Sequence, residues 1–185
     1  MRKELENTNW HVYGLSTADF GVTLRLIDSI ISCRAGELKQ ELSGVIVTDE
    51  KGNEVPKDHA GFQEVIADLN YYHWIENLFI YQFGFWRLHG ILEGILRQKF
   101  FPEEELPGLK RKIDRIIQLG FKVDKKDHEE LLRWSRLRNA LSHFPPEEYR
   151  PTGIMRDDLE EYIDLACRVL HQLTSQKESN SNQSQ

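Results

Sequence analysis

Three residues that could act on a phosphodiester lie within six positions of the chain: Arg138, Asn139 and His143. An arginine offers a permanent, fork-shaped cation that suits a phosphate group, and a histidine can accept or release a proton near neutral pH. Pro145 disfavours the helical conformation for Phe144, so we expect the helix that carries Arg138 to end at or just beyond His143. These are the minimum groups for cleaving a phosphodiester without a metal, provided that they converge on one target.

The spacing of these residues restricts how they could converge. Residues five apart on a regular helix point about 140° away from each other, so Arg138 and His143 do not share a face. Asn139 and His143 are four apart and do share one. Either the last helical turn unwinds, or a second copy of the chain completes the site. We favour a symmetric homodimer, because a two-fold axis beside this helix end would bring two arginines and two histidines together.

The order of Arg138, Asn139, three further residues and His143, late in a small helical chain, resembles the R-x4-6-H signature of the HEPN superfamily. Members of this superfamily are small helical bundles, frequently dimeric. Many are metal-independent ribonucleases of toxin–antitoxin, phage-defence and RNA-processing systems, and others keep the fold without activity. The resemblance therefore implies RNA as a partner and a cognate antitoxin or regulatory protein as another. One subgroup carries a modified tyrosine two residues after the histidine. That position is Pro145 here, so we do not expect this modification.

The expected reaction is attack of a neighbouring 2′-hydroxyl group on the scissile phosphate of RNA. His143 would act as the base, or as the acid toward the leaving 5′-oxygen. Arg138 would hold the phosphate and offset the charge of the transition state, and Asn139 would orient His143 or bind the phosphate. DNA lacks the 2′-hydroxyl, so the mechanism predicts specificity for RNA. It requires no metal and no cofactor.

A further set of residues around the motif is expected to bind the substrate: Ser142, Arg136, Arg133 and Lys112. Residues 108–143 carry ten lysines and arginines against five acidic residues, a local charge of +5, whereas the rest of the chain has −11. This positive segment is either an ordinary solvated helix face or a rim that attracts phosphate.

A structural alternative stands beside the catalytic interpretation. Arg138 could pair with a carboxylate of another helix, and His143 could only cap the last carbonyl groups of its own helix. The protein would then be a catalytically inactive helical module that binds RNA, a nucleotide or a partner protein.

Other possible sites are weaker. His73 with Glu76, and His89 with Glu93, have helical spacings that a metal could use. Carboxylate-bridged di-iron bundles, however, need Glu-x-x-His twice with further glutamates, so we expect no metal site. Cys33 and Cys167 are far apart, and we expect them to be buried and reduced in a cytoplasmic protein. The chain has no apolar run of membrane-spanning length.

Hydrophobic residues make up 39% and charged residues 29% of the 185 residues, which is typical of a globular domain. The periodicity predicts an all-α fold, an up-and-down bundle of about five helices in a domain over residues 16–174. An N-terminal arm over 1–15 and a disordered tail over 175–185 would flank it. The first expected element is a helix from the caps at 16–19 to about 40, followed by a small β-hairpin or irregular insertion near 44–58. Residues 60–101 are expected to form one long helix, or two helices broken near 83–85. A short helix from 109 ended by Gly120, the motif helix over 127–142 capped by Asp124 or Asp127, and a last helix from 157–158 complete the bundle.

Aromatic residues concentrate between Phe62 and Trp86 and fall on more than one helical face. A single core-facing stripe cannot account for all of them. Core packing explains most of these rings, and burial in a dimer or a stacking platform for bases are the alternatives.

Overall fold

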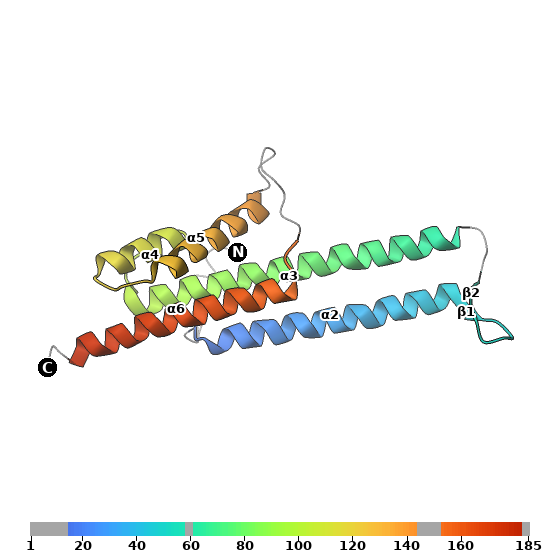
Figure 1. The fold of residues 1–185 in the computed structure, drawn as a ribbon, viewed down its shortest axis with the longest axis horizontal. Helices are drawn as coiled ribbons and strands as arrows, with labels where there is room; N and C mark the ends of the chain where they lie inside the picture. The colour runs from blue at the N-terminus through green and yellow to red at the C-terminus, as the bar shows by residue number, and fades with distance from the viewer. Residues whose placement is uncertain (1–14, 58–60, 144–152, 183–185) are drawn as a thin grey trace, which may run out of the picture.

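The computed structural model describes residues 15–57, 61–143 and 153–182, and within them the chain forms five helices and one two-stranded antiparallel hairpin (Figure 1). The all-α class and the small hairpin are thus as expected. The N-terminal arm up to residue 14 lies outside the described residues. The elements are α2 (Ala18–Val45), β1 (Ile46–Thr48), β2 (Glu54–Pro56), α3 (Phe62–Phe100), α4 (Leu109–Gln118), α5 (Lys125–His143) and α6 (Arg156–Asn182).

The helices α2 and α3 form a long antiparallel pair whose far end extends beyond the bundle made with α4, α5 and α6 (Figure 1). The strands β1 and β2 lie at this far end, with Val47 opposite Val55. Their turn is closed by the carboxylate of Asp49, which accepts hydrogen bonds from the backbone N–H groups of Lys51 and Asn53. Gly52 adopts the positive φ that the turn requires (82°). The insertion predicted near 44–58 is therefore a hairpin.

The core lies at the other end, where the C-terminal half of α3 meets α4, α5 and α6. Tyr162 of α6 is fully buried at its centre, and Phe85 and Trp134 pack edge-on against its ring with centroids 5.1 and 5.6 Å away. α3 continues through residues 83–85 without a break, so one long helix, not two, is present. Gly84 lies in this stretch because α2 packs so closely there that a Cβ atom would lie 2.2 Å from Cδ1 of Ile27.

The helix that carries the motif begins where a side chain can cap it. Asp124 accepts hydrogen bonds from the backbone N–H groups of Lys126 (2.8 Å) and Asp127 (3.3 Å), which satisfies two of the unpaired donors of the first turn. Of the two predicted caps, Asp124 therefore fills the role. Asp127 is buried and instead pairs with Arg168 of α6, with 2.8 Å between Oδ1 and Nη2.

Two expectations are corrected. The tail predicted to be disordered from Ser175 continues α6 as helix to Asn182, because Gln176 accepts a hydrogen bond from the Lys122 N–H and donates one to its carbonyl oxygen. Cys33 and Cys167 are both free thiols, as expected. Cys33, however, is exposed on the outer side of α2 and not buried. None of the described helices combines the length and the hydropathy needed to cross a lipid bilayer.

We predict that Gly84→Ala lowers the free energy of unfolding by about 1–3 kcal/mol, because the new methyl group must displace the buried side chain of Ile27. The measurement is urea denaturation followed by circular dichroism. Gly90→Ala is the matched control in the same helix. A Cβ atom there meets nothing within 4 Å, so this variant should gain about 0.5–1 kcal/mol of stability. Equal effects at both positions would contradict the close α2–α3 packing.

Candidate functional site

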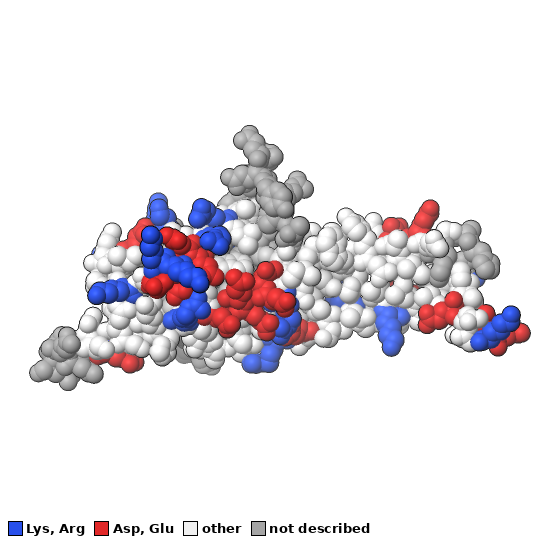
Figure 2. Space-filling model, in the orientation of Figure 1, with Lys and Arg blue, Asp and Glu red and all other residues white. Residues whose placement is uncertain are grey.

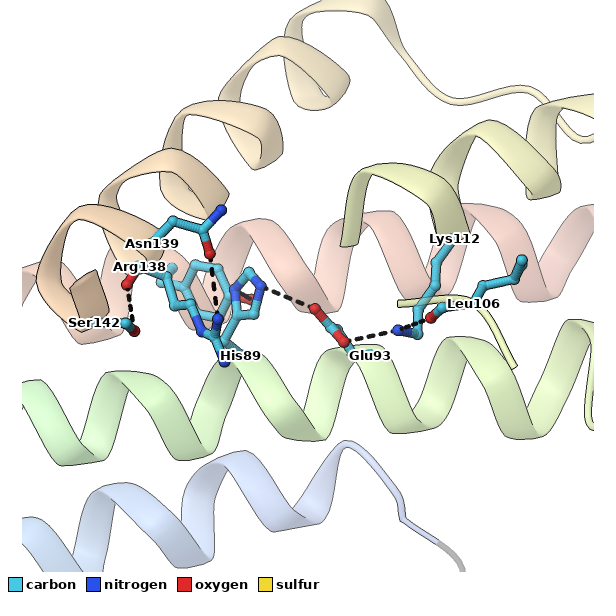
Figure 3. Close-up of polar contacts among 8 residues, drawn as sticks. His89, Glu93, Leu106, Lys112, Arg138, Asn139 and Ser142 are labelled. Carbon is cyan, nitrogen blue, oxygen red and sulfur yellow. Dashed lines mark hydrogen bonds and ion pairs between the residues drawn. The ribbon is translucent and has the colours of Figure 1, made fainter. Parts of the chain in front are cut away.

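Arg138 and Asn139 line a surface cavity of about 410 Å³ between α3, α5 and the beginning of α4. Figure 3 shows both side chains reaching from α5 toward the turn of α3 that carries His89. α4 begins in the wall of this cavity with Gly108 as its N-cap, and no side chain caps its first turn. The cavity is lined by His89, Glu93, Pro107, Gly108, Leu109, Lys110, Arg111, Ser135, Arg138 and Asn139.

The guanidinium of Arg138 is held by an amide and not by an acid. Its Nη1 atom donates a hydrogen bond to Oδ1 of Asn139, 3.2 Å away (Figure 3). No carboxylate pairs with Arg138 within the described part of the chain. The alternative in which an acidic residue of another helix neutralises Arg138 thus has no support among the described residues. The positive charge faces a cavity that an anion can enter.

His89 and Glu93 form another part of the cavity wall and belong to a largely buried network of polar side chains (Figure 3). Nδ1 of His89 lies 3.1 Å from the Tyr162 hydroxyl, and Nε2 lies 3.3 Å from Oε1 of Glu93. The Nζ atom of Lys112 donates to Oε2 of Glu93 at 2.7 Å and to the carbonyl oxygen of Leu106 at 2.6 Å. In a neutral imidazole, Nε2 therefore carries the proton toward Glu93, and the Tyr162 hydroxyl donates to Nδ1.

The surroundings of this row of polar side chains change the pKa values of two of them, Glu93 and Tyr162. Burial alone raises the pKa of Glu93, but the hydrogen bonds from His89 and Lys112 and the charge of Lys112 outweigh it and bring that pKa to about 2. Burial, with a smaller contribution from the charge of Glu93, raises the pKa of Tyr162 well above its ordinary value. At neutral pH Glu93 is therefore a carboxylate, and the Tyr162 hydroxyl is un-ionised.

The predicted substrate-binding residues are not brought together. Lys112, predicted to bind the substrate, is buried in the ion pair with Glu93 and does not line the cavity. Arg133 lines a separate cavity of about 250 Å³ beside Trp134. Arg136 is exposed and donates from Nε to the Leu132 carbonyl of its own helix. Ser142 donates to the carbonyl oxygen of Arg138 at 2.8 Å, a bond within the helix.

His143 is the last described residue of α5. Its side chain lies outside the described residues. The helical period places position 143 on the same face of α5 as Asn139, one turn further along. Its backbone position thus continues the row that begins in the cavity wall at Asn139.

His89 and Glu93 are the residues that the sequence did not connect with Arg138. Their spacing of four residues was visible, and two polar residues within the apolar run of α3 are a signal of a buried polar site. They bind each other, Tyr162 and Lys112. Within the described chain, no group of three or more potential metal ligands is arranged to hold an ion.

Ion pairs neutralise part of the positive charge of residues 108–143. Arg115 binds both carboxylate oxygens of Glu104, and Lys112 is neutralised by Glu93. Figure 2 accordingly shows basic and acidic side chains intermingled on the face of the bundle that it displays, with no continuous basic patch there. The excess of positive charge is thus local, and the cavity with Lys110, Arg111 and Arg138 is one place where it remains.

Comparison with known proteins returns no match: no family model, no curated protein and no solved structure is similar to this chain.

We predict that the stability advantage of the wild type over Glu93→Gln disappears as the pH falls from about 4.5 to 2. The folded-state pKa of Glu93 lies below its ordinary value, so its ionised form stabilises the fold above about pH 4.5, and this contribution is lost as the carboxylate is protonated. At neutral pH the variant should be about 3 kcal/mol less stable, because Lys112 stays buried without its partner. Urea denaturation across this pH range measures the difference. A difference independent of pH would contradict the ion pair.

Proposed function

We propose that this protein is a metal-independent endoribonuclease similar to the nucleases of the HEPN superfamily. The observation that carries the proposal is the guanidinium of Arg138, which lines a cavity large enough for part of a nucleotide and has no carboxylate partner among the described residues. The guanidinium lines an open surface cavity with its charge unneutralised, so it is available to an incoming anion. A phosphate group matches its fork-shaped donors.

The chemistry follows from three residues near the end of α5. Arg138 holds the scissile phosphate and stabilises the extra negative charge of the transition state. His143 removes the proton from the attacking 2′-hydroxyl or supplies one to the leaving 5′-oxygen, and Asn139 keeps the guanidinium in place through its 3.2 Å hydrogen bond. The substrate is RNA, because the nucleophile is its own 2′-hydroxyl.

The active form is a homodimer in which a histidine of one subunit complements an arginine of the other. Arg138 and position 143 lie about 140° apart around α5, so one subunit alone does not direct both at one phosphate. An exposed apolar stripe supports dimerisation. Val65, Tyr72, Phe79 and Phe83 follow each other at intervals of seven, seven and four along one face of α3 and are 44–63% exposed. Exposed apolar rows of this kind mark interfaces.

The stripe also leads to the cavity. The ring of Phe83 contacts that of Trp86 with centroids 5.3 Å apart, and Trp86 lies three residues before His89 in the cavity wall. One end of the stripe thus lies within two helical turns of the cavity wall along α3. In its biological setting the enzyme acts as a toxin or phage-defence effector in the cytoplasm, restrained by a cognate antitoxin or regulatory protein.

A second candidate function is binding of RNA, a nucleotide or a partner protein without cleavage. The observation in its favour is the state of His89, the described imidazole in the cavity wall. Both of its ring nitrogens are occupied by Tyr162 and Glu93, so it is not free to move a proton for a substrate. Without a working His143, the cavity would bind phosphate and do no chemistry.

We predict that the purified protein cleaves single-stranded RNA in the presence of a chelator and leaves DNA of the same sequence intact. Arg138→Ala and His143→Ala should each lower the cleavage rate about 100-fold or more, because each removes a group that acts in the transition state. A gel assay with a fluorescent oligonucleotide measures the rate. Lys126→Ala is the control on the same helix, since Lys126 lies at the exposed start of α5 and does not line the cavity.

Two results would count against the nuclease. Cleavage that survives both Arg138→Ala and His143→Ala would assign the activity to another site or to a contaminant. RNA binding that depends on Arg138, with no cleavage by the wild type, would favour the second candidate. Unchanged unfolding curves are expected for Arg138→Ala, because Asn139 is its one side-chain partner in the described structure.

We predict that Phe79→Glu with Phe83→Glu converts the dimer to a monomer, because it places two charges in the apolar stripe. Light scattering after gel filtration gives the mass. The rate of RNA cleavage should fall when the dimer is lost, although Arg138 is unchanged. Ile117→Glu on α4, another exposed apolar position, is the control and should leave both unaffected. A wild-type monomer that cleaves RNA would refute the composite site.

A further inference from the structure

The cavity that contains Arg138 has a second cationic wall. Lys110 and Arg111 line it from the first turn of α4, whereas Arg138 lines it from α5. Both α4 residues are exposed, and neither pairs with a carboxylate in the portion of the chain that the structure describes. Positive charge thus enters the same space from two helices.

The acidic residue of the cavity does not cancel this charge. Oε1 of Glu93 is engaged by His89, and Oε2 is engaged by Lys112 at 2.7 Å. The ammonium of Lys112 offsets the carboxylate, so the charge that remains in the wall is that of Lys110, Arg111 and Arg138. An anion that enters the cavity meets a net positive surface.

The same ion pair holds the second wall in place. Lys112 follows Arg111 directly, and its Nζ atom is bonded both to Glu93 of α3 and to the Leu106 carbonyl oxygen before α4. The first turn of α4 is therefore fixed against the helix that forms the cavity floor. Because the backbone of this wall is already fixed, binding an anion requires ordering of the Lys110 and Arg111 side chains only, which lowers its cost.

We infer that the cavity binds two phosphate groups of one RNA strand, the scissile phosphate at Arg138 and a neighbouring phosphate at Lys110 and Arg111. The cavity volume of about 410 Å³ lies within the range of roughly 300–1,000 Å³ for ligand sites and leaves room for more than a single phosphate. The inference rests on the proposed function and adds the substrate class, which is an oligonucleotide with a phosphate beside the bond that is cut.

The experiment compares dinucleotides that differ by one phosphate only. The probes are 2′-O-methyl dinucleotides, which cannot undergo 2′-hydroxyl attack, without a terminal phosphate or with one at the 5′ or the 3′ end. For the wild type, one of the two terminal phosphates should tighten binding about tenfold, as expected for a charge-assisted contact. Lys110→Ala with Arg111→Ala should abolish this advantage, and Arg138→Ala should weaken all three probes. Calorimetry or fluorescence anisotropy gives the affinities.

The matched control is Lys125→Ala with Lys126→Ala, which removes the same charge from the exposed start of α5 outside the cavity and should keep the advantage. Equal affinities of the wild type for all three probes, or an advantage retained by the α4 variant, would overturn the inference. Because the probes are not cleaved, the result is independent of the nuclease assay. Phosphate-dependent binding without cleavage of ordinary RNA would support the two-phosphate site and refute the proposed nuclease.

Discussion

The ion pair between Lys112 and Glu93 is the interaction on which the rest of the site depends. It lies within a helical core, where two apolar side chains would pack without the cost of removing charges from water. The charges are tolerated because Glu93 also binds His89, which in turn binds Tyr162. These four side chains connect α4, α3 and α6. Removing one of them therefore leaves a buried polar neighbour without its partner. The relative position of three helices thus follows from one line of contacts.

Apolar neighbours set the backbone position of Arg138 in α5, whereas its guanidinium is oriented by the hydrogen bond to Asn139. Trp134 of the same helix packs against Phe85 and Tyr162, and Leu141 is buried in the same core. Gln82 of α3 donates to the Leu141 carbonyl oxygen at 3.2 Å. These contacts set the rotation of α5 about its axis, and the rotation brings Arg138 to the cavity. A cation that is placed by its neighbours in this way keeps its own hydrogen-bonding capacity for a ligand.

The fold was largely predictable from the sequence because its signals are local. Apolar spacing, the cap at Asp124 and the glycine at the end of α4 each act within a few residues. The site was not predictable to the same degree. Lys112 was expected to bind the substrate, and its partner Glu93 lies 19 residues earlier on another helix, a pairing that no local pattern reveals. The helical continuation beyond Ser175 was missed for the same reason, since Gln176 binds the backbone of Lys122.

The uninterrupted course of α3 connects the two ends of the molecule mechanically. This helix runs for 39 residues from the β-hairpin end to the core, and its sequence contains no proline, the usual cause of a sharp bend. No proline bend therefore separates Tyr72 from Glu93, and a displacement of α3 near Tyr72 is transmitted along the helix to Glu93. A partner that binds the projecting pair of helices would therefore also restrain the part of α3 that lines the cavity.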